Sequence, residues 1–195
     1  MDDENTIKIA MFGGYGIDIA SISHSYVTGQ YGDDIESANE KELSKVINIE
    51  GITVNLNIIN TPGKDDFSVN HYPDFVLING MILVFDISKQ QSIETIIEIY
   101  NEAKECKYFR FKDVICAVAA DNCHLRDEGA DNLVPVEEYK KLEAEFNCKV
   151  FETSTKTGAG IVEMFTYITK RVLQDIGLIR EEYENVQEKR RCSIA

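Results

Sequence analysis

A glycine-rich turn separates an apolar run from an amphipathic segment in residues 8–23, KIAMFGGYGIDIASIS. This layout is typical of a phosphate-binding loop, because glycines let backbone N–H groups approach an anion at the N-terminus of a helix. The complete motif ends in Gly-Lys-Ser or Gly-Lys-Thr, whose lysine contacts the phosphates and whose hydroxyl contacts Mg²⁺. Here the turn ends in Gly16-Ile17-Asp18, so an apolar group replaces the cation and a carboxylate replaces the hydroxyl.

Two interpretations of this turn are open: the glycines either only shape a strand-to-helix connection, or they surround an anion with backbone donors. At an effective dielectric of about 20, two unit charges about 4 Å apart interact by roughly 4 kcal/mol. Losing the lysine and adding Asp18 would together cost roughly 5–8 kcal/mol, which converts a nanomolar polyphosphate site into a nearly millimolar one. A carboxylate can also hold Mg²⁺ directly, so Asp18 stays a weak candidate metal ligand. We favour the first interpretation. The candidate residues of the loop are Gly13, Gly14, Tyr15, Gly16, Ile17 and Asp18.

The segments that must position this turn alternate between apolar strands and amphipathic helices. Strands are expected at 7–12, at 80–87, 114–120 and 148–153, and as a pair within 43–60 joined at Glu50-Gly51. Helices are expected at 17–26, 92–107, 136–146 and 159–176. The segments 27–42 and 61–74 are polar and predict surface loops. This order predicts an α/β fold with a mostly parallel sheet, helices on both faces and ligands at the carboxyl ends of the strands.

Three phrases in the correct order and spacing identify a family resemblance: NTPGKD (60–65), ILVFDISKQQSIETI (82–96) and FETSTKTGAGIVEMFTYI (151–168). Together with the glycine turn, they resemble a Ras-like small GTPase over roughly residues 6–176. The resemblance implies a G domain at 6–177, built on a mostly parallel six-stranded sheet. It leaves a charged C-terminal tail at 178–195.

The switch motifs of that family are altered here. Alignment with the first switch places Asp34 where the family presents a threonine to Mg²⁺, which makes Asp34 a second weak metal candidate. The second switch, Asp-x-x-Gly-Gln in Ras proteins, reads Asn60-Thr61-Pro62-Gly63-Lys64, so only Gly63 is retained. Metal binding and water positioning both lose their residues, and hydrolysis by the family mechanism is not expected.

Base recognition in the family uses Asn-Lys-x-Asp after the fifth strand, and the matching stretch here is Asp121-Asn122-Cys123-His124. A neutral histidine accepts at most one hydrogen bond, so His124 cannot select guanine with two. The third base loop keeps its residue types, since Ser154-Thr155-Lys156 matches Ser-Ala-Lys. The candidate nucleotide-binding residues outside the glycine turn are therefore Gly63, Asp121, Asn122, His124, Ser154, Thr155 and Lys156.

The chain ends in Cys192-Ser193-Ile194-Ala195, which fits the C-a-a-X pattern for prenylation at Cys192, and the terminal alanine favours farnesyl. The basic run 189–191 precedes this motif, which predicts attachment to the cytoplasmic face of a membrane. The formal net charge of −14 argues against nucleic acid as a partner.

The sequence thus favours a prenylated signalling adaptor with a degenerate nucleotide site, a pseudo-GTPase without catalytic residues. It would bind protein effectors or regulators through loops 28–42 and 61–75, and we expect it to need no cofactor. The alternative is a divergent GTP-binding switch with GTPase activity, whose cofactors would be GTP or GDP with Mg²⁺.

Overall fold

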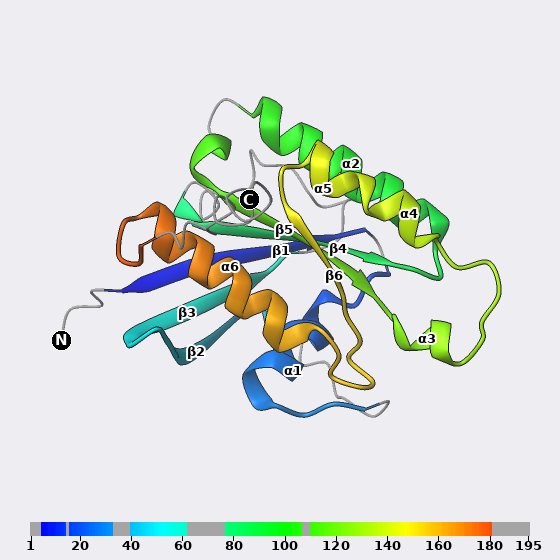
Figure 1. The fold of residues 1–195 in the computed structure, drawn as a ribbon, viewed down its shortest axis with the longest axis horizontal. Coiled ribbons are helices and arrows are strands. Elements are labelled where there is room, and N and C mark those ends of the chain that lie inside the picture. Colours follow the sequence, from blue (N-terminus) through cyan, green and yellow to red (C-terminus); the bar gives the residue numbers. More distant parts are fainter. Residues whose placement is uncertain (1–4, 15, 33–39, 62–76, 107–109, 181–195) are drawn as a thin grey trace, which may run out of the picture.

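The computed structural model describes residues 5–14, 16–32, 40–61, 77–106 and 110–180. In this part of the chain six strands form one sheet in the order β2-β3-β1-β4-β5-β6 (Figure 1). Only β2 is antiparallel to its neighbour β3, and the other described pairs are parallel. The strands are β1 (Thr6–Gly13), β2 (Glu42–Ile49), β3 (Ile52–Asn60), β4 (Gly80–Asp86), β5 (Ile115–Asp121) and β6 (Lys149–Glu152). The predicted α/β fold with a mostly parallel six-stranded sheet is confirmed.

Helices cover both faces of the sheet and enclose two hydrophobic cores. The first face carries α1 (Ile19–Thr28) and α6 (Ile161–Asp175). The second carries α2 (Gln90–Glu105) and the short helices α4 (Val136–Tyr139) and α5 (Lys141–Glu145). The one-turn helix α3 (His124–Asp127) follows β5.

The continuous apolar sequence of β4 follows from burial on both faces. Ile82 and Val84 pack in the core under α1 and α6, whereas Met81, Leu83 and Phe85 pack in the core under α2. Alternate residues of a strand point to opposite faces, so a central strand covered on both sides needs apolar residues throughout.

The predicted start of the first helix at Ile17 is wrong. The helix begins at Ile19, because Asp18 has non-helical dihedral angles (φ −85°, ψ 72°) and its side chain accepts a hydrogen bond from the Ser21 backbone N–H. Asp18 is therefore the N-cap residue, a position for which aspartate is one of the preferred residues.

The predicted helix 136–146 is also corrected, because the structure divides it into α4 and α5. The N–H of Glu143 donates to the carbonyl of Lys140, a three-residue spacing that interrupts the four-residue α-helical pattern. The predicted ends of the other helices and strands differ by one or two residues, as in α2, which begins at Gln90 rather than Ser92.

The chain beyond α6 stays attached to that helix for a few residues. Gly177 adopts a left-handed conformation (φ 77°), and the N–H groups of Leu178 and Ile179 both donate to the carbonyl of Leu173. Ile179 packs against the core beneath α6. The boundary between domain and tail at 177/178 stays a prediction. Among the described helices, none combines the length and the apolar character needed to span a membrane.

Candidate functional site

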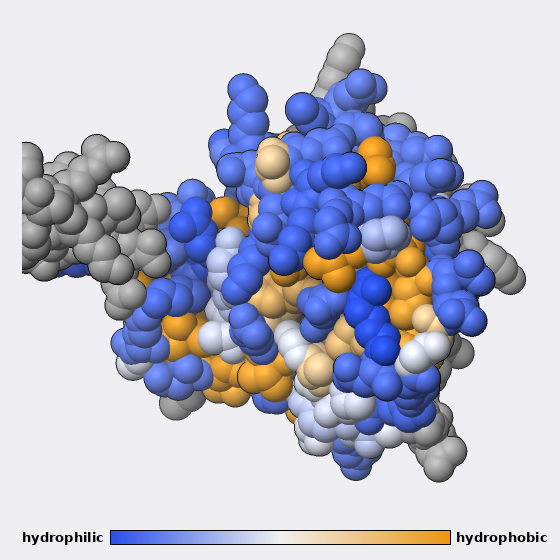
Figure 2. All heavy atoms as spheres, turned by 45° about the vertical axis from the view of Figure 1, so that its right-hand side comes forward, coloured by the Kyte–Doolittle hydropathy of each residue, from blue (hydrophilic) through white to orange (hydrophobic). Residues whose placement is uncertain are grey.

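The loops that follow β1, β4, β5 and β6 meet at the carboxyl ends of these parallel strands, on the right in Figure 1. Figure 2 turns this end forward and shows exposed hydrophobic residues in patches separated by hydrophilic ones. The described candidate residues lie in these loops or at the strand ends that lead into them, as expected for ligand sites in parallel sheets.

At the glycine turn and the first turn of α1, three backbone N–H groups are already used by the chain itself. The N–H of Ile17 donates to the carbonyl of Gly14 (3.1 Å), and the N–H of Ile19 donates to the carbonyl of Ile17 (3.0 Å). The Asp18 carboxylate accepts from the backbone N–H of Ser21 (3.0 Å) and, through its other oxygen, from the Ser21 hydroxyl (2.5 Å). The helix N-terminus, where a phosphate would bind, thus already holds an anion from its own sequence.

Each described glycine of the turn has a structural reason that requires no phosphate. A Cβ on Gly13 would lie 3.1 Å from side-chain carbons of Ile17 and Ile19, and a Cβ on Gly14 would lie 3.1 Å from Thr95 of α2. Gly16 has φ +74°, a left-handed conformation that glycine adopts without strain. Close packing and turn geometry therefore account for all three.

Ile17 lies half-buried against the core formed by α1, α6 and the sheet. An ammonium at this position would bring charge to a place where the chain now makes apolar contacts. The isoleucine that stands in place of the family's lysine therefore contributes to the hydrophobic packing of the domain.

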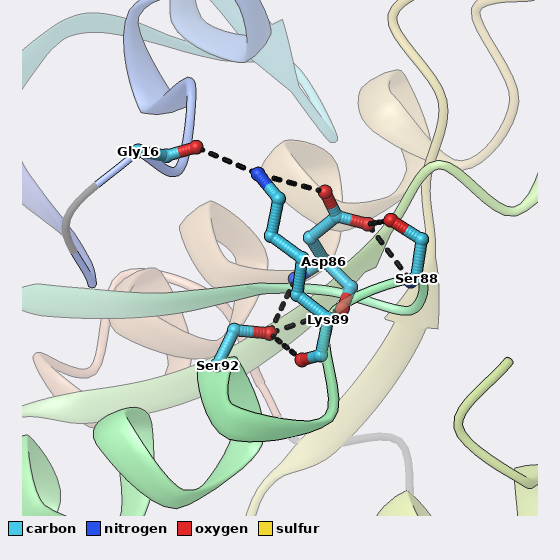
Figure 3. Close-up of polar contacts among 5 residues, drawn as sticks. All are labelled: Gly16, Asp86, Ser88, Lys89 and Ser92. Atoms are coloured by element: carbon cyan, nitrogen blue, oxygen red, sulfur yellow. Dashed lines mark hydrogen bonds and ion pairs between the residues drawn. The ribbon is translucent and has the colours of Figure 1, made fainter. Parts of the chain in front are cut away.

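A lysine from another loop reaches the turn, as Figure 3 shows. The Nζ of Lys89 donates to the carbonyl of Gly16 (3.0 Å) and forms an ion pair with Asp86 at the end of β4 (3.3 Å). Ser88 donates to the same carboxylate from its N–H (2.9 Å) and its hydroxyl (2.7 Å). The Ser92 hydroxyl closes the connection by donating to the carbonyl oxygens of Lys89 (2.6 Å) and Asp86 (3.0 Å).

Asp86 and Asp121 are register partners at the ends of β4 and β5, and their pKa values move in opposite directions. Burial works to raise the pKa of Asp86, but hydrogen bonds from Ser88, helped by Asn122 and Lys89, bring this pKa below its ordinary value. Burial raises the pKa of Asp121 to about 6, with smaller contributions from the negative charges of Asp86 and Asp18. The negative charges of Asp86 and Asp18 thus already act on Asp121, where a polyphosphate would add more negative charge.

The candidate base-binding residues make contacts with each other and with their neighbours. The Ser154 hydroxyl and the Nδ1 of His124 lie 2.8 Å apart, which joins the two base motifs directly. The Thr153 hydroxyl donates to Asp121 (3.0 Å), and the Nζ of Lys156 pairs with Glu128 (3.0 Å). Asn122 has φ +66°, an uncommon backbone conformation outside glycine.

The described start of loop 28–42 lies over the third base loop. The N–H of Gly32 donates to the carbonyl of Thr155 (3.1 Å). The Tyr31 ring lies so close to Gly158 that a Cβ there would be 3.1 Å from three ring carbons. A chain segment, tied by a backbone hydrogen bond, therefore contacts the loop that the family uses against the base.

Several predicted site residues lie outside the described part of the chain: Tyr15, Asp34, Gly63 and Cys192. Asn60, which replaces the metal-side aspartate of the family motif, is described, and its side-chain amide donates to the carbonyl of Glu40 (2.9 Å). Among the described residues, no group of three or more His, Cys, Asp or Glu side chains is arranged to hold a metal ion.

Sequence reasoning missed the cluster around Lys89. Lys89 lies in the phrase 82–96 that carries the family resemblance, but no binding role was assigned to it. Its position shortly after a buried strand, in a loop at the carboxyl end of the sheet, was a usable signal. Tyr31 and Thr153 were missed because their contacts depend on loops distant in sequence.

These contacts fit a magnesium-bound guanine nucleotide poorly. The turn's N–H groups named above are occupied, a carboxylate lies at the helix N-terminus, and Lys89 is paired with Asp86. A nucleotide would have to break these bonds and approach the carboxylates of Asp18 and Asp86.

Comparisons with known proteins agree with the fold. The chain is 25% identical to the GTPase RhebL1 of Bos taurus over 89% of this chain and 90% of that protein. It is 25% identical to the GTP-binding protein Rheb homolog of Drosophila melanogaster, covering 96% of each, and 26% identical to the GTP-binding protein Rheb of Homo sapiens, covering 86% and 89%. The profile of the Ras family matches residues 8–174, nearly the whole described fold. The chain belongs to the Ras family.

Proposed function

We propose that this chain is a Ras-family signalling adaptor that keeps the G-domain fold without a cycle of GTP binding and hydrolysis. The observation that carries the proposal is Asp18, whose two carboxylate oxygens cap α1 at the place where the family motif has its metal-binding hydroxyl. The relatives named above are described as GTPases or GTP-binding proteins. This chain would differ from them in acting without bound GTP.

The charges around the glycine turn support the proposal that this chain does not bind GTP tightly. An added anion near Asp18 and Asp86 is repelled, and the neighbouring cation Lys89 is already paired. Unit charges about 4 Å apart contribute roughly 4 kcal/mol at an effective dielectric of about 20, which corresponds to nearly a thousandfold in affinity.

Titration of the purified chain with a fluorescent GTP analogue, with and without Mg²⁺, tests the proposal. We expect no saturable binding up to roughly 100 µM, because charge repulsion and the occupied N–H groups oppose the triphosphate. Human GTP-binding protein Rheb serves as the positive control. Micromolar or tighter binding that requires Mg²⁺ would instead establish the alternative, a divergent GTP-binding switch.

The surfaces that would bind effectors or regulators are loops 28–42 and 61–75. Their described ends are anchored to the sheet: Asn60 holds the backbone at Glu40, and the Thr61 hydroxyl donates to the carbonyl of Met11 (2.8 Å). We propose that binding through these loops does not depend on a γ-phosphate, since the contacts of their described ends require none.

We also propose that prenylation of Cys192 attaches the chain to the cytoplasmic face of a membrane. A single lipid chain gives only marginal binding, and the basic run 189–191 would add roughly 1 kcal/mol per residue on an anionic surface. In eukaryotic cells, Cys192→Ser should move the protein from the membrane fraction to the soluble fraction, and Cys148→Ser is the matched control. Equal membrane fractions for wild type and Cys192→Ser would rule out this anchor.

A further inference from the structure

A groove of about 940 Å³ lies at the opposite end of the sheet from the glycine turn, beside the amino end of β5. Aromatic rings line it: Tyr100 stacks on Phe146 at 3.8 Å between ring centroids and meets Phe111 edge-on at 5.0 Å. Tyr167 of α6 also lines the groove. A concave, partly aromatic surface of this volume is suited to a peptide segment or a small ligand.

The groove is basic, although the chain as a whole carries a net charge of −14. Among the described residues, its charged lining consists of the four cations Lys104, Arg110, Lys112 and Arg171 and the two carboxylates Asp113 and Asp175. Asp113 is paired with Arg110 (2.8 Å). Within the described part of the chain, Lys104, Lys112 and Arg171 form no ion pair, so this groove has cations available for an acidic occupant.

The chain reaches this groove as it leaves α6. Arg171 and Asp175 line the groove from the C-terminal part of α6, and the described chain ends at Arg180, shortly beyond Asp175. The next residues are Glu181-Glu182-Tyr183-Glu184, three carboxylates around one aromatic ring. Only residues 176–180 separate the groove lining at Asp175 from this segment, so docking of the segment needs no long linker.

We propose that the acidic segment 181–184 docks into this basic groove of its own chain. The carboxylates pair with Lys104, Lys112 and Arg171, and Tyr183 packs on the aromatic lining. A short covalent connection gives the segment a millimolar effective concentration, which a separate peptide lacks. The concave, aromatic lining favours this segment over a flat anionic membrane surface. Docking holds the start of the tail against the domain and so sets where residues 185–195 leave it.

The absence of tryptophan from the chain provides a direct test. In full-length Tyr183→Trp, the introduced indole is the sole source of tryptophan fluorescence, and it lies in the tail. We expect blue-shifted emission and quenching by acrylamide about threefold weaker than in the same chain carrying Lys112→Glu and Arg171→Glu. Raising the salt to 1 M, where the Debye length is about 3 Å, should expose the indole without any groove substitution.

Lys41→Glu with Lys140→Glu makes the same charge change at exposed positions outside the groove, and should leave the indole protected. Circular dichroism must show equal folding of all variants, and the salt series needs no groove variant at all.

Docking is contradicted if the indole is as readily quenched beside the unmodified groove as beside the charge-reversed one. Protection that grows with protein concentration would show exchange between two copies and would also contradict it. Groove-dependent binding to phosphatidylserine vesicles with the indole exposed would identify a membrane site instead.

Discussion

A chain carrying Ile17→Lys and Asp18→Ser is expected to bind a fluorescent GTP analogue at least about 100-fold more tightly than the unmodified chain. The substitution adds an ammonium beside the phosphates and removes one of the carboxylates that repel them. Serine is also a good N-cap residue, so α1 should keep its hydrogen bond at the N-terminus. The lysine stem can replace part of the apolar contact that Ile17 makes with the core.

The control for this experiment is Ile17→Met with Asp18→Ser, which removes the carboxylate without adding a cation. This control should show only part of the gain in nucleotide affinity. The remaining difference in affinity between the two variants measures the contribution of the lysine ammonium. Binding would be followed by titration with and without Mg²⁺, after thermal unfolding has shown that each variant is folded. If the lysine-containing chain gains nothing, the charge at positions 17 and 18 is not what excludes nucleotide. The defect would then lie in other residues such as His124.

Asp121→Asn is expected to raise the free energy of unfolding relative to the unmodified chain, and this gain should be larger near neutral pH than at acidic pH. Burial raises the pKa of Asp121 from 3.8 to about 6 in the folded chain. The folded state therefore binds this proton more tightly, and stability falls as pH rises from about 4 through about 6. A shift of this size corresponds to a loss of about 3 kcal/mol of stability when Asp121 ionises. The asparagine variant avoids this loss because its side chain stays neutral at every pH.

The measurement is the free energy of unfolding of both chains in urea between pH 4.5 and pH 7.5. The quantity of interest is how the difference between them changes with pH, because any constant effect of the substitution cancels. The effect of Asp86 on the pH dependence of stability has the opposite sign, because its pKa is lowered in the folded chain. The stability that Asp86 contributes is lost only as the pH falls below its ordinary pKa of 3.8. Asp131→Asn, at an exposed position, controls for the loss of one negative charge. A difference that stays constant over this range would show that Asp121 does not titrate as described.

The fold could be predicted well from the sequence because its signals are local. The uninterrupted apolar run 80–87 indicated a strand buried on both faces, and the α2 and α6 sequences carry apolar stripes at helical spacing. The start of α1 was predicted wrongly because the helical spacing of apolar residues runs back to Ile17, which packs against the core from outside the helix. That spacing does not say what the residue at position 18 does. An aspartate there can equally bond the N–H three residues on, and the local geometry selects that role.

The altered site was visible in part. The residue types at positions 17, 18 and 124 predict the loss of the family's phosphate and base contacts, and this loss stays a prediction. Their new partners were not predictable, because Lys89, Thr95 and Tyr31 come from loops or helices far along the chain. The groove at the amino end of β5 was equally invisible, since its lining combines residues from 100 to 175.

By itself the sequence determined the alternation of strands and helices, the family resemblance and the absence of the phosphate-binding lysine from the glycine turn, because each depends on residue type and short spacing. Only the tertiary structure decided that Asp18 caps its own helix, that Lys89 bonds to Gly16, and that Asp121 is buried beside Asp86. The reason is physical: hydrogen bonds, desolvation and charge interactions depend on distances between side chains, and packing alone sets those distances.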